Sequence, residues 1–219
     1  MMAALNGFLE VTRYLATQCN ADVNATDRRG DTALMKAAYN GKIDAVRCLV
    51  EEYDMDVNVT NSEGDTALMI ASRNSKIEVI RYLAEQCGAD VNVVNKDGKS
   101  ALMRAAKNGK IEIVQYLAEK CGADVDVNDN DGNTALMKAA ENGKLEVVQY
   151  LGKHCRVDLN VTTNDQNTAV RVAADRGFNE IQRILMPFVQ PPHQADTSDP
   201  TDLLVPSGSS HLFLCLRSN

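Results

Sequence analysis

Apolar residues along the chain recur at the spacing of one helix face, in segments that short polar turns separate. In one such segment they fall at Ile77, Ile80, Leu83 and Ala84, which are positions i, i+3, i+6 and i+7 of a helix. A shorter apolar segment precedes each longer one, and an Asn-Gly pair or a similar turn lies between the two. The pattern predicts units made of a turn, a short helix, a second turn, a longer helix and an extended return.

The predicted unit returns every 34 residues. The stretch GDTAL at 30–34 returns as GDTAL at 64–68, GKSAL at 98–102, GNTAL at 132–136 and QNTAV at 166–170. The glycine suits a tight turn that needs a positive φ, and the hydroxyl residue that follows suits a cap for the first helix. A single unit cannot bury its own apolar face, so the repeat predicts a stack of units.

These units resemble ankyrin repeats, both around each Thr-Ala-Leu-Met and in endings such as Gly88–Asn92, which reads Gly-Ala-Asp-Val-Asn. Ala33 and its equivalents stand where the family has Pro, and Met35 and its equivalents stand where it has His. The resemblance covers about residues 1–186. It implies an all-α repeat solenoid, an ankyrin-type stack of antiparallel helix pairs joined by β-turn or hairpin loops.

The register predicts an ankyrin repeat domain over residues 1–189 and a disordered tail, containing Pro and Ser, over 190–219. The units of the domain are a truncated repeat at 1–26, full repeats at 27–60, 61–94, 95–128 and 129–162, and a degenerate cap repeat at 163–189. Because the first repeat lacks its turn, we expect the N-terminal end to expose apolar surface and to fray or self-associate there. The apolar residues 211–216 are either a loosely docked end or a short recognition motif.

Composition and charge narrow the classes of function. The chain is 44% apolar but only 5% aromatic, with no Trp, which suits thin Ala-lined layers of helices. A formal charge of −7 disfavours nucleic acid and anionic membranes as partners. No apolar run reaches the roughly 20 residues that span a bilayer, and the N-terminus does not match a signal peptide. We therefore expect a cytoplasmic protein, with the nucleus left open.

Candidate chemistry is sparse. The chain contains no protease, hydrolase, dinucleotide or P-loop motif, so we expect no enzyme, no catalytic residue and no cofactor. Cys19, Cys87, Cys121 and Cys155 share one repeat position and are expected to be half-buried thiols. His154 beside Cys155 has no further ligand at zinc spacing, so no metal site is expected. The resemblance also implies that the asparagines of the Asp-Val-Asn position are candidates for hydroxylation, namely Asn24, Asn58, Asn92 and Asn160.

After these exclusions, the function that the sequence favours is binding of another protein. In the family that these units resemble, the turn tips and the outward side of the first helices line a concave recognition face. The columns of that face vary from repeat to repeat, whereas packing holds the Leu34 column constant. The candidate partner-binding residues are Arg28, Arg29, Asp31, Lys36, Tyr39, Glu63, Asp65, Ile70, Arg73, Lys96, Asp97, Lys99, Arg104, Lys107, Asn130, Asp131, Asn133, Lys138 and Glu141. Tyr39, Ile70 and the arginines are the expected anchors, because aromatic and Arg side chains dominate binding hot spots.

One first-helix column is basic, with Lys36, Arg104 and Lys138, although the molecule is acidic. This column favours an acidic segment on the partner. The leading hypothesis is therefore a non-catalytic protein-interaction module that acts as an adaptor, a scaffold or an occluding inhibitor. The alternatives are a fragment of a longer array that serves as a spacer or associates end to end, and a substrate of an asparagine hydroxylase. The sequence does not identify the partner.

Overall fold

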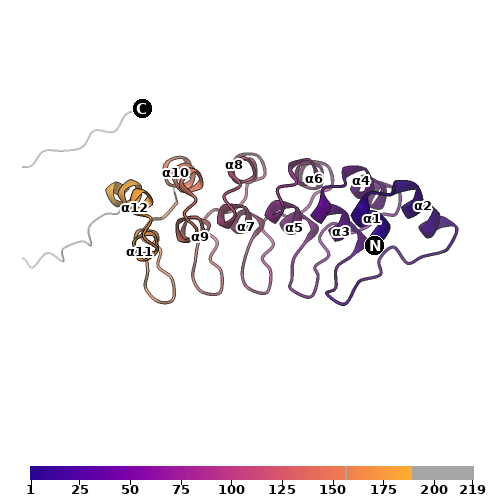
Figure 1. Ribbon diagram of the computed structural model, residues 1–219, viewed down its shortest axis with the longest axis horizontal. Helices are drawn as coiled ribbons and strands as arrows, with labels where there is room; N and C mark the ends of the chain where they lie inside the picture. The colour runs from indigo at the N-terminus through magenta and orange to yellow at the C-terminus, as the bar shows by residue number, and fades with distance from the viewer. Residues whose placement is uncertain (156, 189–219) are drawn as a thin grey trace, which may run out of the picture. The chain divides into compact units, whose positions relative to one another are not determined.

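The computed structural model describes residues 1–155 and 157–188, which form a row of helix pairs (Figure 1). The first helices of the pairs are α1 (Met2–Asn6), α3 (Ala33–Asn40), α5 (Ala67–Arg73), α7 (Ala101–Lys107), α9 (Ala135–Glu141) and α11 (Ala169–Asp175). The second helices are α2 (Leu9–Thr17), α4 (Ile43–Glu51), α6 (Ile77–Arg81), α8 (Ile111–Lys120), α10 (Leu145–His154) and α12 (Asn179–Leu185). A π-helical turn, η1 (Tyr82–Gln86), continues α6, and a 3-10 turn, η2 (Met186–Phe188), follows α12. The expected all-α repeat solenoid is confirmed, and its long loops carry turns rather than strands in the described residues.

Each first helix from α3 to α11 begins at a hydroxyl side chain that caps it. The hydroxyl oxygens of Thr32, Thr66, Ser100 and Thr134 each accept the backbone N–H three residues further on, at 3.3 Å. Thr168 does the same for α11 at 3.4 Å. A cap of this kind satisfies one of the unpaired donors of the first turn and stabilises a helix by about 1 kcal/mol.

The core is a set of layers lined by small and unbranched side chains. Leu34 and Met35 are each 2% exposed, and their equivalents in the next three units are 1–2% exposed. Ala37 and Ala38 on the first helix α3 are fully buried. The methionines that stand at the family's usual His position are thus core residues, and the alanines explain how the helices approach so closely without aromatic side chains.

The loops between units join one another at their tips. The backbone N–H of Lys96 donates to the Glu63 carbonyl at 3.0 Å, and that of Asn130 donates to the Asp97 carbonyl at 2.9 Å. Gly98 permits this contact, because it has a φ of +77° and an added Cβ would lie 2.9 Å from the Asn130 nitrogen. The tips therefore line up in a row along one side of the helix stack (Figure 1).

The second helices are linked from unit to unit by tyrosines. The hydroxyls of Tyr82, Tyr116 and Tyr150 donate to Glu51, Glu85 and Glu119 of the preceding unit at 2.9, 2.6 and 2.9 Å. Burial and these hydrogen bonds raise the pKa of all three phenols. Tyr82, Tyr116 and Tyr150 are thus framework residues.

The cysteines of the described residues form no disulfide. Cys87, Cys121 and Cys155 are half-buried as expected, whereas Cys19 is exposed. Burial raises the pKa of the three half-buried thiols, which makes them poor nucleophiles at neutral pH.

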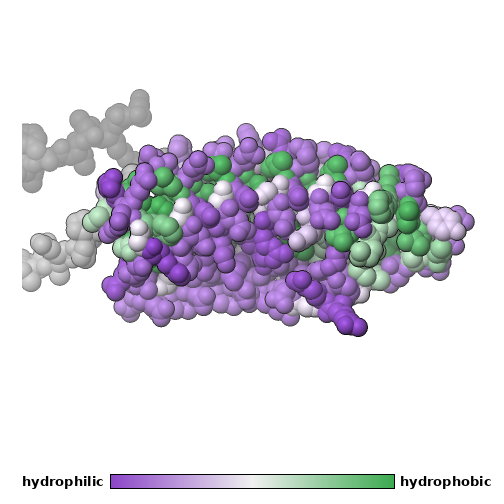
Figure 2. Space-filling view, in the orientation of Figure 1, coloured by the Kyte–Doolittle hydropathy of each residue, from purple (hydrophilic) through white to green (hydrophobic). Residues whose placement is uncertain are grey.

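Apolar side chains gather at the end of the row that carries α1 and α2, where Figure 2 shows hydrophobic surface. Met2 is 69% exposed, Phe8 59%, Val11 47% and Tyr14 60%. This exposure agrees with the expected apolar end. The predicted tail at 190–219 and its apolar residues 211–216 lie outside the described residues. Among the described helices, none is long and apolar enough to cross a membrane.

Candidate functional site

The turn tips and the first helices share one side of the stack, which we call the inner face. It consists of the tips at 27–31, 61–65, 95–99, 129–133 and 163–167 together with the first helices α3, α5, α7, α9 and α11. The candidate partner-binding residues all belong to these segments, but the structure places them at different depths. The exposed ones are Arg28, Arg29, Tyr39, Glu63, Lys96, Asp97, Lys107, Asn130 and Asp131. The half-buried ones are Lys36, Arg73, Lys99, Arg104, Asn133, Lys138 and Glu141.

Three candidates are buried rather than displayed. Asp31 is 7% exposed, Asp65 3% and Ile70 4%. The two carboxylates hold neighbouring tips together, because Asp31 Oδ1 accepts Asn61 Nδ2 at 2.7 Å and Asp65 Oδ1 accepts Asn95 Nδ2 at 3.0 Å. These aspartates therefore build the face, and a partner would meet little of their surface.

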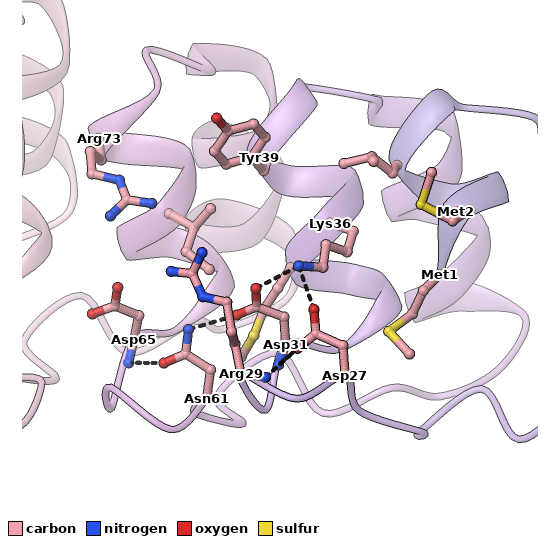
Figure 3. Close-up of a pocket in the computed structure, with 13 residues that line it drawn as sticks. Met1, Met2, Asp27, Arg29, Asp31, Lys36, Tyr39, Asn61, Asp65 and Arg73 are labelled. Carbon is pink, nitrogen blue, oxygen red and sulfur yellow. Dashed lines mark hydrogen bonds and ion pairs between the residues drawn. The ribbon is translucent and has the colours of Figure 1, made fainter.

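A hollow of about 450 Å³ lies at the N-terminal end of the inner face. We call it the N-terminal hollow. Its apolar lining comes from Met1, Met2, Leu5, Met35 and Ile70, and its polar lining from Asp27, Arg29, Asp31, Lys36, Tyr39, Asn61, Asp65 and Arg73. Figure 3 shows Arg29 extending from its turn toward Arg73, with Tyr39 on the same rim. The hollow thus brings together seven of the predicted residues, from two tips and two first helices.

Lys36 is already paired within this hollow. Its Nζ lies 2.8 Å from an Asp27 carboxylate oxygen and 2.6 Å from an Asp31 carboxylate oxygen. The hydrogen bond from Lys36 lowers the pKa of Asp27 to about 2. Lys36 therefore stabilises the turn and contributes little uncompensated charge to the face.

The other two bases of this column are paired as well. Arg104 forms an ion pair with Asp65 of the preceding unit, and Lys138 Nζ lies 2.9 Å from Asp129 Oδ2. The basic column, on which the expectation of an acidic partner segment rested, is thus neutralised by carboxylates of the same face. The sequence did not indicate the pair formed by Arg104, because Arg104 and Asp65 are 39 residues apart and belong to different units.

The cations of the inner face that form no ion pair lie outside the Lys36, Arg104 and Lys138 column. Among residues 1–155 and 157–188, no ion pair involves the cations of the inner face at Arg28, Arg29, Arg73, Lys96 and Lys107. Arg104 lies beside this group, and its Nε is buried without a hydrogen-bond acceptor in the described residues. Burial lowers the pKa of Arg104 and the charge of Arg73 lowers it further, although Asp65 opposes the shift. The N-terminal half of the inner face therefore holds more donors and positive charge than its own carboxylates satisfy.

A second hollow, of about 440 Å³, lies at the other end of the inner face and is mostly polar. We call it the C-terminal hollow; its lining includes Asp131, Glu141, Asp165 and Arg176. Arg176 pairs with Glu141 at 2.6 Å, whereas Asp131 and Asp165 take part in no ion pair of the described residues. The two ends of the face thus differ in charge, which the formal charge of the whole chain conceals.

The candidate modification sites Asn24, Asn58, Asn92 and Asn160 are all exposed on the loops. Two of them also join units, because Asn58 Oδ1 accepts the Asp90 N–H and Asn92 Oδ1 accepts the Asp124 N–H, each at 2.9 Å. A structural role therefore accounts for at least these two asparagines. In the part of the chain that the structure describes, no group of three His, Cys, Asp or Glu side chains is placed to hold a metal ion.

Comparison with known proteins gives a family and a structural relative. A family model for ankyrin repeats, described as containing three copies, matches residues 1–95, 86–162 and 102–196. Comparison with curated proteins gave no significant match. Among solved structures, the chain is similar to one in the complex of the predatory endopeptidase Bd0816 from Bdellovibrio bacteriovorus with immunity protein Bd3460. The TM-score is 0.74 and the identity 29%, over 85% of this chain and 95% of that one.

Proposed function

We propose that this chain, which belongs to the ankyrin repeat family, is a non-catalytic module that binds a partner protein through its inner face. The observation that carries the proposal is the division of the repeat into two kinds of position. The Leu34 and Met35 columns are 1–2% exposed in four units and nearly invariant, whereas the Tyr39 column is exposed or half-buried and changes from Tyr to Arg, Lys and Glu. Positions that packing leaves free to vary are the ones available for contacts with a partner.

The size of the two hollows supports this proposal. Volumes of about 450 and 440 Å³ are large enough to receive side chains of a partner, and both hollows open on the same face. We propose that the chain acts as an adaptor, a scaffold or an occluding inhibitor. The structural relative comes from a complex between an endopeptidase and an immunity protein, which favours the inhibitor among these three roles.

Affinity purification with matched variants tests the proposal. The tagged chain would be compared with an inner-face variant and an outer-face variant in lysate of the cell that produces it. The inner-face variant is Tyr39→Ala, Arg73→Ala, Lys107→Ala, and the outer-face variant is Gln86→Ala, Glu112→Ala, Lys153→Ala. All the altered outer-face positions are exposed on or next to second helices. We expect one or more proteins to bind the unaltered chain and the outer-face variant but to be lost from the inner-face variant, with circular dichroism unchanged.

A purified partner would then be titrated calorimetrically against the same three proteins, with a single binding site expected. Equal retention by all three proteins would show that the inner face is not the binding surface.

A second candidate function is self-association through the apolar end of the row. The exposed side chains of Phe8, Val11 and Tyr14 on and before α2 favour it, since contiguous apolar surface marks an interaction site. Light scattering over a range of concentrations tests it: we expect the mass to rise with concentration, and Val11→Lys to abolish the rise. A mass that stays monomeric at all concentrations would exclude self-association.

A further inference from the structure

The N-terminal hollow differs from the rest of the inner face because it combines an apolar floor with unpaired positive charge. Met35 and Ile70 form the floor but are only 2% and 4% exposed, so the displayed apolar surface is that of Met1 and Met2, at 38% and 69%. Arg29 and Arg73 stand beside it. We infer that this hollow receives a point on the partner where an acidic side chain is adjacent to a large apolar side chain. The inference rests on the proposed function, and it identifies the chemistry that the face selects.

The apolar part of the hollow arises where an isoleucine replaces the base of the Lys36, Arg104 and Lys138 column. Ile70 occupies the position that Lys36, Arg104 and Lys138 hold in other units. Its side chain carries no charge to pair with the neighbouring acids, and it lies 4% exposed at the bottom of the hollow. Tyr39, which is 47% exposed, adds an aromatic wall. A leucine or phenylalanine of the partner would therefore be removed from water by packing against the exposed side chains of Met1, Met2 and Tyr39 in this hollow.

The charged half follows from the pairing within the hollow. Its carboxylates are already engaged, since Asp31 binds Lys36 and Asn61, and Asp65 binds Arg104 and Asn95. Arg29 and Arg73 have no such partner in the described residues, and two guanidinium groups on one hollow favour a ligand that accepts several N–H donors. A carboxylate does so in a bidentate geometry, and the pairing is stronger than a neutral hydrogen bond.

The opposite end of the inner face explains why an acidic segment would settle at this end. Asp131 and Asp165 line the C-terminal hollow without an ion pair in the described residues. Like charges at that end disfavour the same acidic segment by repulsion. The charge difference therefore gives the bound segment one direction along the row.

Two short peptides that differ in one charge test the inference by nuclear magnetic resonance. The probes are acetyl-Gly-Ser-Leu-Glu-Ser-Gly-amide and the same peptide with Lys in place of Glu, each titrated to millimolar concentration into the isotope-labelled full chain. We expect the Glu peptide to shift the Ile70 methyl and Tyr39 ring signals, and to bind at least tenfold more tightly than the Lys peptide. We expect Arg73→Gln to weaken the Glu peptide about tenfold. Lys107→Gln is the matched control, because Lys107 occupies the Arg73 column in the next unit and is also an unpaired cation.

The outcomes separate this inference from the proposed function. Equal binding of the two peptides, shifts confined to other residues, no shift at all, or equal effects of Arg73→Gln and Lys107→Gln would each overturn the charge selection. The purification with inner-face and outer-face variants is independent of that result, because it depends on loss of a protein partner and on no peptide. If a partner protein binds the unaltered chain but not the inner-face variant, while the two peptides show no charge selection, the inference is rejected and the proposed binding function stands.

Discussion

The ion pair between Asp65 and Arg104 gives a quantitative test of how the units are held together. Asp65 has a side chain that is 5% exposed, and that of Arg104 is 13% exposed. Asp65 Oδ1 also accepts Asn95 Nδ2 at 3.0 Å, so one carboxylate serves two donors of the following unit. Replacing Asp65 with Ala would leave both donors without this acceptor.

The expected cost follows from burial of the guanidinium. Removing one partner of a fully buried ion pair costs about 3–5 kcal/mol, because the other charge stays buried and uncompensated. Arg104 keeps some contact with water, which reduces the penalty, so we expect Asp65→Ala to lower the free energy of unfolding by about 2–4 kcal/mol. In Asp65→Ala, Arg104→Met the pair is replaced by apolar groups and only the Asn95 amide stays without its acceptor, at a cost of about 1 kcal/mol, so we expect the double variant to recover the rest of the loss.

Urea unfolding followed by circular dichroism at neutral pH measures these differences. The slope of the free energy against urea should stay the same in all three proteins, since the surface exposed on unfolding hardly changes. A loss below about 1 kcal/mol in Asp65→Ala would mean that the guanidinium reaches water easily. A double variant no more stable than Asp65→Ala would show that the orphaned charge is not the source of the loss, and either result refutes the reasoning.

Three further predictions concern the framework. Tyr116→Phe loses the hydrogen bond to Glu85 and should cost about 1 kcal/mol at pH 7. Because folding raises the pKa of the Tyr116 phenol, its contribution to the free energy of unfolding is present below pH ~10 and is lost as the pH rises further. In urea unfolding at alkaline pH, the free energy of unfolding should therefore fall less with pH for Tyr116→Phe than for the unaltered chain. Gly98→Ala forces a Cβ onto a φ of +77° beside the Asn130 nitrogen and should cost about 1–3 kcal/mol in the same unfolding assay. Thr134→Ala removes the cap of α9 and should cost about 1 kcal/mol, whereas Thr134→Ser should cost less than half of that.

The repeating part of the fold was predictable because every unit carries the same local signals. Thr66, for example, is followed in the sequence by apolar and then by small residues. In the structure its hydroxyl caps the start of α5. These signals act over a few residues and do not depend on distant contacts. The depth of the inner-face columns was harder to predict, because a variable position such as Ile70 is either exposed or buried depending on its neighbours.

Charge pairing was the part of the candidate site that the sequence did not reveal. The Lys36, Arg104 and Lys138 column indicated a positive surface, but each base contacts a carboxylate of a turn tip. Lys36 and Lys138 bind acids of their own tips, whereas Arg104 reaches back to the preceding unit. A long side chain has many rotamers with similar energies, so a repeat register does not specify which neighbour it contacts.

The break in that column at Ile70 links stability to the proposed recognition. Where the second, fourth and fifth units have a base, the third unit has Ile70, and Asp65 receives its cation from Arg104 of the next unit. The ion pair therefore spans two units and stabilises their interface, while Ile70 leaves an uncharged floor next to it. Arg73 takes part in no ion pair in the described part of the face. The apolar Ile70 between Lys36 and Arg104 thus connects the uncharged floor, the cross-unit ion pair and the unpaired guanidinium of Arg73, which are the three properties from which we infer an acidic and apolar partner segment.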